Sequence, residues 1–244
     1  MLDGIRLAVT TLTVLPLRVG RVDRSAAAVA MAVAPAVGAL LGLVLAGLHE
    51  GLRALGSPAL VAAGVTVAVG ALLTRGLHLD GLADTVDALG SYRSGPAALE
   101  IMKKADIGPF GVVALVATTL IQAAALTEAG PWALVAAWTA GRLAITVACR
   151  RGVPAARPEG LGALVASTVP LWAVTLAAAF TVVLAAAAVP GRPWQGPAAV
   201  VTAMFAVVLL LRHSVRRFDG ITGDVLGASV ELAVTLTLIA ATLG

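Results

Sequence analysis

Residues 26–48 read AAAVAMAVAPAVGALLGLVLAGL and contain no charged side chain. A helix of roughly 20 such residues is long enough to cross the hydrocarbon core of a bilayer. The whole chain of 244 residues shares this character, since 59% of its residues are hydrophobic and only 12% are charged. Soluble proteins carry about 25% charged residues. The sequence therefore predicts an all-α, polytopic membrane protein, folded as one helical bundle and one domain over 1–244.

Six further segments are apolar enough to cross a membrane, which predicts about seven transmembrane helices in all. A shorter apolar piece, residues 5–17, ends near Pro16 and is expected to lie at the membrane interface or to re-enter the membrane; an eighth span is the alternative. The six segments are 57–74, 109–127, 131–149, 169–189, 197–211 and 225–243.

The lysines and arginines are distributed asymmetrically about these segments. With the N-terminus inside, fourteen of the 17 lie in inner segments, Arg53 and Arg192 lie outside, and Arg142 lies within a span. Such an excess marks the cytoplasmic side. We therefore expect the N-terminus and the loops 75–108 and 213–224 to face the cytoplasm. Orientation in the bilayer also explains the net charge of +4, so no nucleic-acid partner is expected.

An acidic cluster follows the second span, in the stretch RGLHLDGLADTVD at 75–87. Asp80, Asp84 and Asp87 are spaced i, i+4 and i+7, which places them on one stripe of a helix. Because such close like charges repel, the cluster predicts a bound cation, and carboxylate oxygens are ligands that Mg²⁺ prefers. His78 lies off this stripe, and its candidate roles are a catalytic base, a structural residue or a contact to the substrate. The alternative is a solvated face paired with nearby arginines.

A second polar stretch, EIMKKADIGPFG at 100–111, precedes the third span. Lys103 and Lys104 come before Asp106, and Gly108-Pro109 opens the span. The free amide groups at a helix N-terminus favour an anion, so a lysine here is a candidate phosphate ligand. An ordinary junction between a loop and a span, with basic residues on the inner side, explains the same pattern.

The third stretch, FDGITGDVLGASVE at 218–231, enters the last span. Asp224, Gly227 and Glu231 share one helix face, and Gly227 would let another helix or a ligand approach closely. Glu231 lies about two turns into the apolar region, where a carboxylate is costly and indicates function. An ion pair with Arg142 that holds helices together is the alternative.

These stretches, in this order and between these spans, resemble the cobalamin synthase family, the adenosylcobinamide-GDP ribazoletransferases. At Lys104 the chain differs from many relatives, which carry an aspartate there; its own nearest acid is Asp106. The resemblance rests on GLHLDGLADTVDALG (76–90), EIMKKADIGPFGV (100–112), the pair Gly141-Arg142 and GITGDVLGASVE (220–231), with a looser match at TLTVLP (11–16).

The resemblance implies a Mg²⁺-dependent transferase of the bacterial or archaeal cytoplasmic membrane. It would join adenosylcobinamide-GDP to α-ribazole, or to its 5′-phosphate, and release GMP. The implied metal ligands are Asp80, Asp84, Asp87 and Asp224. The implied catalytic residues are Asp84, Asp224 and His78. The implied substrate-binding residues are Arg75, Lys103, Lys104, Arg142, Thr222 and Glu231.

The residues alone leave two other functions open. One is an alcohol phosphotransferase that acts on a nucleotide-activated lipid, which would also place aspartates and Mg²⁺ at the inner end of a span. The other is an ion-coupled transporter in which Arg142 and Glu231 form a relay. The lipid bilayer is a partner in every case, and the sequence allows a homo-oligomer.

Overall fold

The computed structural model describes residues 1–243, and its regular elements in that range are all α-helices. In chain order they are α1 (Leu2–Leu12), α2 (Arg24–Ala54), α3 (Ala59–Leu73), α4 (Leu77–Gly90), α5 (Pro96–Ile101), α6 (Pro109–Leu126), α7 (Pro131–Ala148), α8 (Gly160–Val165), α9 (Leu171–Ala185), α10 (Gln195–Phe218) and α11 (Gly223–Ala241). The predicted all-α fold is confirmed.

Each of the seven apolar segments forms a helix, but their lengths differ. Five helices, namely α2, α6, α7, α10 and α11, are long and apolar enough to cross a membrane. The bent pair α3 and α4 would make a sixth span, and α9, with 15 residues, is shorter than the others. The structure therefore supports five spans, or up to six, where the sequence predicts about seven.

The N-terminal apolar piece does not form an eighth span. Helix α1 has 11 residues, which at a rise of about 1.5 Å per residue covers roughly half of the hydrocarbon core. It packs closely on α2, because a Cβ at Gly4 would lie 2.5 Å from the Cβ of Val29. The interfacial or re-entrant placement of this short helix stays a prediction.

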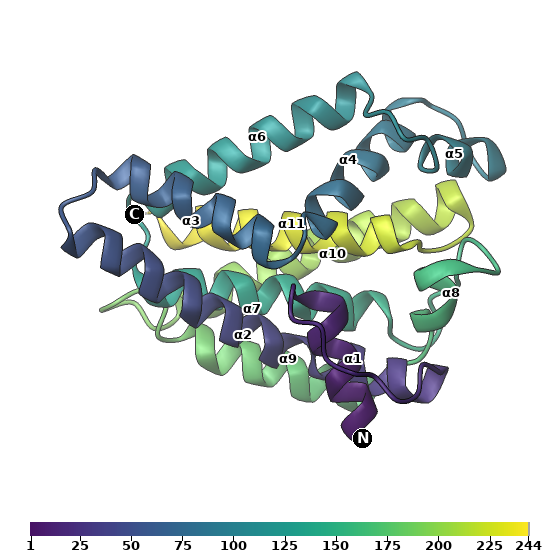
Figure 1. The fold of residues 1–244 in the computed structure, drawn as a ribbon, viewed down its shortest axis with the longest axis horizontal. Helices are drawn as coiled ribbons and strands as arrows, with labels where there is room; N and C mark the ends of the chain where they lie inside the picture. Colours follow the sequence, from purple (N-terminus) through teal and green to yellow (C-terminus); the bar gives the residue numbers. More distant parts are fainter. Residues whose placement is uncertain (244) are drawn as a thin grey trace.

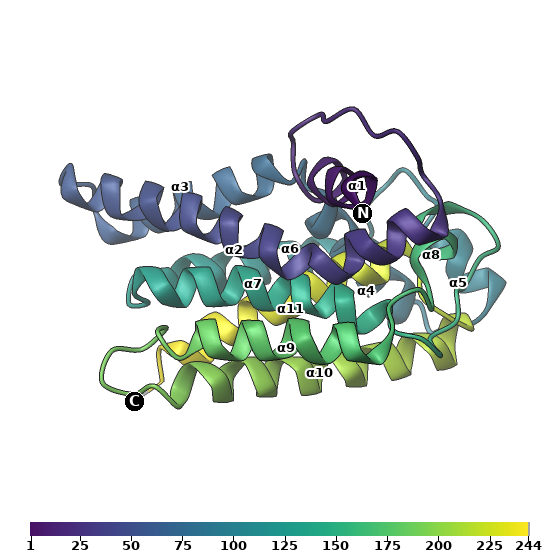
Figure 2. The same cartoon turned by 90° about the horizontal axis from the view of Figure 1, so that it is seen from below.

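Helices α7 and α11 lie in the middle of the bundle (Figure 1 and Figure 2). Figure 2 shows α2 and α3 on one side of this pair and α9 and α10 on the other. Small residues allow the close packing of α2 on α7, since a Cβ at Gly38 would lie 2.4 Å from the carbonyl oxygen of Trp138. Membrane helices commonly use small residues in this way, since lipid supplies no hydrophobic force between them.

The chain turns sharply between α3 and α4, whose axes differ by 90°. Arg75 and Gly76 both adopt the left-handed conformation, with φ of 56° and 67°. Gly76 adopts it without steric cost because it has no Cβ. The sequence predicts a loop over residues 75–108. The structure instead forms two helices, α4 and α5, within this range. The turn carries α4 across α11, as Figure 1 shows.

Candidate active site

Helices α4 and α11 cross at two glycines, one from each helix. A Cβ at Gly81 would lie 2.7 Å from the carbonyl oxygen of Asp224, and one at Gly227 would lie 2.9 Å from that of His78. No larger residue fits these positions without moving a backbone. The expectation that Gly227 admits another helix is confirmed, and the crossing brings the acidic face of α4 beside the start of α11.

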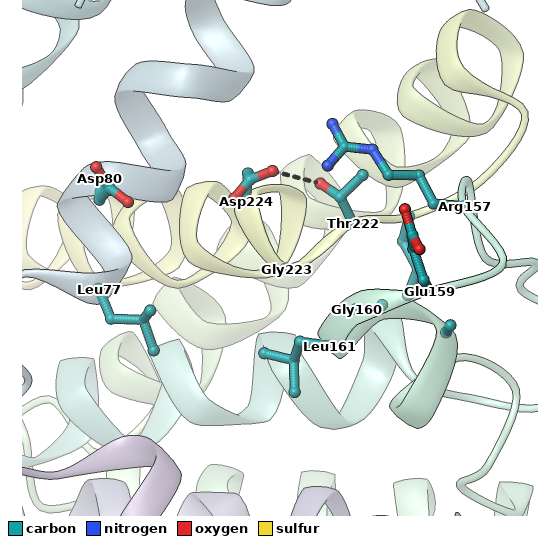
Figure 3. A pocket seen from close by; sticks show the side chains of 12 residues that line it. Leu77, Asp80, Arg157, Glu159, Gly160, Leu161, Thr222, Gly223 and Asp224 are labelled. Carbon is teal, nitrogen blue, oxygen red and sulfur yellow. Dashed lines mark hydrogen bonds between the residues drawn. The ribbon is translucent and has the colours of Figure 1, made fainter. Parts of the chain in front are cut away.

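The crossing gathers three carboxylates from two helices. The charges of Asp80 and Asp224 both lie close enough to Asp84 to repel it. Asp80 and Asp224 line a hollow of about 220 Å³ between α4, α8 and the turn that precedes α11. Figure 3 shows this hollow from close by, with Asp80 on α4 and Asp224 on α11. We call Asp80, Asp84 and Asp224 the acidic triad.

Thr222 orients one member of the acidic triad. It is the N-cap of α11, and its hydroxyl oxygen accepts a hydrogen bond from the backbone N–H of Val225 at 3.2 Å. The same hydroxyl lies 3.1 Å from Asp224 Oδ2 and donates to it. A capping interaction of this kind fixes both the start of the helix and the side chain that it contacts. Thr222 thus has a positioning role, and it also lines the hollow.

Arg157 is a functional candidate that the sequence indicates only as one of the inner charges. Ala155 pairs in parallel with Ile221, and the Ala156 N–H donates to the Ile221 carbonyl at 3.0 Å. This pairing holds the Arg157 loop against the turn before α11. The guanidinium donates to the Leu99 carbonyl at 2.7 Å, and within residues 1–243 its buried Nε has no partner. Arg157 lines the hollow and is the cation that partly offsets Asp84 and Asp224.

Asp87 lies on the same helix as Asp84 but has different partners. Its two carboxylate oxygens accept hydrogen bonds from the backbone N–H groups of Gly108, at 2.8 Å, and Gly111, at 2.9 Å. These groups belong to the N-terminus of α6, where a negative charge is favourable. The anion expected at this N-terminus is therefore a side chain of the protein. The structure places Asp87 as a helix cap rather than as a free metal ligand.

The two lysines of the second stretch have different surroundings. Lys103 is exposed and forms an ion pair with Glu100 at 3.0 Å. Lys104 and Asp106 instead line a second hollow, of about 240 Å³, together with Asp84. Lys104, but not Lys103, is thus brought to the carboxylates of α4.

Two predicted site residues face away from the acidic triad. His78 is 3% exposed, and its Nε2 has no hydrogen-bond partner in the described part of the chain. It lines a small apolar cavity with Met31, and not the hollow of the acidic triad. The Arg75 guanidinium donates to the carbonyls of Thr10, at 3.2 Å, and Thr11, at 3.4 Å. In these positions, His78 and Arg75 contact the helices that surround the site and not the hollow itself.

Arg142 and Glu231 belong to a separate polar cluster inside the bundle. Arg142 is 1% exposed and lies over the ring of Trp138, 4.3 Å from its centroid. Glu231 accepts a hydrogen bond at 2.8 Å from Gln122, which also donates to Thr235 at 3.0 Å. Over residues 1–243, no carboxylate oxygen lies within 4.0 Å of the Arg142 guanidinium. The suggested direct ion pair is absent there, and the two charges interact at longer range.

The acidic triad suits a Mg²⁺ ion that is shared with a substrate. Within the described range, no three His, Cys, Asp or Glu side chains are grouped so that they alone could hold a metal. Proteins commonly bind Mg²⁺ through one or two carboxylates, while substrate phosphates and water supply the other ligands. The partly buried carboxylates of Asp84 and Asp224, with Asp80 beside them, fit this mode, whereas Asp87 is already engaged.

Comparison with known proteins finds relatives that match nearly the whole chain. A family model described as cobalamin-5-phosphate synthase matches residues 4–242. An adenosylcobinamide-GDP ribazoletransferase of Frankia casuarinae is 42% identical over 96% of this chain and 92% of its own length. That of Nocardioides sp. is 41% identical over 98% of both chains, and that of an Escherichia coli strain is 36% identical over 84% of both. No solved structure matches. The chain belongs to the cobalamin-5-phosphate synthase family.

Proposed function

We propose that this protein is an adenosylcobinamide-GDP ribazoletransferase that completes the nucleotide loop of cobalamin. It joins adenosylcobinamide-GDP to α-ribazole, or to α-ribazole 5′-phosphate, and releases GMP. The observation that carries the proposal is the meeting of Asp80, Asp84 and Asp224 at the crossing of α4 and α11, beside Arg157. The family and its relatives' names support the choice of substrates.

The balance of atoms identifies the class of the attacking group. With α-ribazole 5′-phosphate the product keeps its 5′-phosphate, so a different hydroxyl of the ribose attacks the phosphorus next to cobinamide. A new P–O bond forms there, the P–O bond to GMP breaks, and the hydroxyl proton must be accepted. Asp224 is our candidate base, because its carboxylate lines the hollow and Thr222 holds it in place.

Arg157 is our candidate ligand for the diphosphate of the activated substrate. A guanidinium donates in a fixed fork that matches phosphate oxygens, and its charge also stabilises the leaving GMP. Arg157 lines the hollow, and its Nε has no hydrogen-bond partner within residues 1–243. Lys104, in the second hollow next to Asp84, is a further candidate for a phosphate contact.

Mg²⁺ is the proposed cofactor, with Asp84 and Asp224 as its main protein ligands and Asp80 beside them. When bound with the diphosphate, a divalent cation neutralises developing charge on the phosphate oxygens. The donor set supports this choice, because Arg157 is the one cation within residues 1–243 whose charge offsets both Asp84 and Asp224, which leaves negative charge to be compensated.

The site is proposed to face the cytoplasm. The argument rests on the distribution of basic residues, because the segments that carry the hollow lie on the side with the excess of arginine and lysine. We therefore place the protein in the cytoplasmic membrane of its cell, with both substrates reaching it from inside.

Purified protein in lipid nanodiscs, supplied with adenosylcobinamide-GDP and α-ribazole, tests the proposal. GMP should accumulate in step with the joined product, and a chelator of divalent cations should stop the reaction until Mg²⁺ is restored. Release of GDP would contradict the proposed bond cleavage, and turnover that survives the chelator would contradict the metal. Release of CMP from a CDP-activated lipid would favour the alternative phosphotransferase.

A further inference from the structure

A third hollow, whose charged residues are all arginines, shares no residue with the hollow of the acidic triad or with the hollow beside Lys104. It measures about 340 Å³ and lies between the turn that follows α7 and the last turns of α10. Arg150 comes from the first of these segments, and Arg212 and Arg216 come from the second. Val153 and Leu211, both buried, form part of its apolar wall. We call Arg150, Arg212 and Arg216 the arginine cluster.

The charges of the arginine cluster are not neutralised by the protein. In residues 1–243, no carboxylate oxygen lies within 4.0 Å of any of the three guanidiniums. Arg150 donates to the Val147 carbonyl at 2.9 Å, but that acceptor carries no net charge. Burial and the charge of Arg212 lower the pKa of Arg150. Three cations around one hollow favour an anion that brings at least one negative charge of its own.

The surface next to this hollow is apolar and follows α10. Val201, Phe205 and Leu209 are all exposed, and with Arg212 and Arg216 they are spaced three or four residues apart, so they share one face of the helix. Helix α10 is long and apolar enough to cross a membrane. An apolar stripe that ends in two arginines matches a molecule with an acyl chain and an anionic head.

We propose that the arginine cluster binds the phosphate head group of an anionic phospholipid, whose acyl chain lies along the exposed stripe of α10. Arginines at the end of a span often only extend toward the interface. Here, however, a third arginine from a different segment completes a hollow, which gives the head group a defined position. Basic pockets between membrane helices on the cytoplasmic side recognise anionic head groups in this way.

The test compares lipid binding to the wild type and to the triple variant Arg150→Gln, Arg212→Gln, Arg216→Gln by native mass spectrometry in detergent. Phosphatidylglycerol is the probe, and phosphatidylcholine is the neutral reference. Each basic residue near an anionic head group contributes several-fold, so we expect the preference for phosphatidylglycerol to fall by on the order of 100-fold in the triple variant.

A matched control removes three other arginines of the same predicted inner side, by Arg6→Gln, Arg18→Gln and Arg21→Gln. All three are exposed, and we expect the control to keep the preference of the wild type. If the triple variant does not fold, Arg212→Gln alone replaces it, because this exposed side chain has no ion pair within residues 1–243. The single variant should lose about fivefold.

Two outcomes would overturn the proposal. The first is an unchanged preference for phosphatidylglycerol in the triple variant, or in the single variant where that one is used. The second is complete displacement of phosphatidylglycerol by inorganic phosphate or GMP at millimolar concentration, which would assign the cluster to a free phosphate compound. The lipid site is supported if neither inorganic phosphate nor GMP displaces phosphatidylglycerol and if the variants lose their preference for this lipid as expected.

Discussion

The acidic triad and the Arg142 cluster both place charged groups among membrane helices, but their composition and surroundings differ. The triad has two carboxylates, Asp80 and Asp224, in one hollow and a third, Asp84, close enough to be repelled by both, with Arg157 as the nearby cation. The Arg142 cluster holds charges of opposite sign inside the bundle without a direct ion pair; Gln122 donates to Glu231, and Arg142 lies over the ring of Trp138. One region has negative charge in excess, and the other is close to neutral.

This difference indicates different roles for the two regions. An excess of like charge is costly in a low-dielectric setting, so the acidic triad is best explained by a cationic or metal-bound ligand. The Arg142 cluster holds one charge of each sign and hydrogen-bonds Glu231, although the buried Nε and Nη2 of Arg142 have no partner within residues 1–243. Such a buried polar network fixes how helices pack. We therefore expect substitutions in the first region to reduce turnover and substitutions in the second to reduce stability.

The largest effect on turnover is expected for Asp84→Asn. The amide is nearly the same size but carries no charge, so it removes a ligand or stabilising charge from the reaction while the packing of α4 is preserved. Turnover measured as GMP release should fall by on the order of 10³-fold, with an unchanged elution volume and helix content in detergent. Wild-type turnover of Asp84→Asn at saturating Mg²⁺ would contradict the role given to this carboxylate.

Gly81→Ala should have the next largest effect, because it changes the geometry of the triad and not its charge. The added Cβ would lie 2.7 Å from the Asp224 carbonyl oxygen and must push α11 away from α4. We expect a loss of about 10-fold to 100-fold in turnover and a destabilisation of about 1–3 kcal/mol.

Gly64→Ala is the matched control for Gly81→Ala. Gly64 also lies within a helix, but apart from its neighbours and the backbone of its own helix, no atom of residues 1–243 lies within 4 Å of the place that an added methyl group would take. Alanine there should leave turnover unchanged and should not lower the melting temperature, since alanine favours a helix over glycine. Equal losses from the two glycines would mean that the close crossing is not what positions the carboxylates.

Asp87→Asn tests whether the aspartate that caps α6 has a different role from Asp84, which belongs to the acidic triad. The amide keeps one oxygen acceptor but loses the charge that faces the N-terminus of α6, where two backbone N–H groups point at the carboxylate. We expect a loss of about 1–3 kcal/mol in stability, with turnover per folded molecule within a few-fold of wild type. If turnover instead falls as far as it does in Asp84→Asn, then Asp87 acts in the reaction as well.

Glu231→Gln should have the smallest effect on turnover. The variant keeps an oxygen that accepts from Gln122 but removes the negative charge that interacts with Arg142. A thermal unfolding experiment in detergent should show a lower melting temperature, because the buried guanidinium loses its compensating charge. A large loss of turnover with an unchanged melting temperature would assign the Arg142 cluster to catalysis.

Local patterns in the sequence predict the helical fold, the shared face of the α4 carboxylates and the close crossing at Gly227. The i, i+4 spacing of Asp80 and Asp84 places them on one face of α4, and Gly227 indicates a close helix crossing, because both follow from the period of a helix. The left-handed turn at Gly76 also has a local cause. The 90° bend it allows is not visible in the sequence, because the bend depends on what α4 packs against.

Contacts between distant segments decide the rest. Asp87 is indistinguishable from Asp84 by spacing, and only the approach of Gly108 and Gly111, more than twenty residues later, makes it a helix cap. Arg157 resembles any other arginine of an inner loop until the pairing of Ala155 with Ile221 brings it beside the hollow. Long-range pairings of this kind leave no periodic pattern in a single sequence.

A double-mutant cycle on Asp84 and Asp224 tests most directly whether the carboxylates of α4 and α11 act as one site. GMP release would be measured for Asp84→Asn, for Asp224→Asn and for the double variant, at saturating Mg²⁺ and both substrates. Groups that act as a unit are strongly non-additive, so we predict that the double variant is about as slow as the slower single variant. If the fold-losses of turnover in the two single variants multiply in the double variant, the carboxylates act independently, and the claim that they form one site is contradicted.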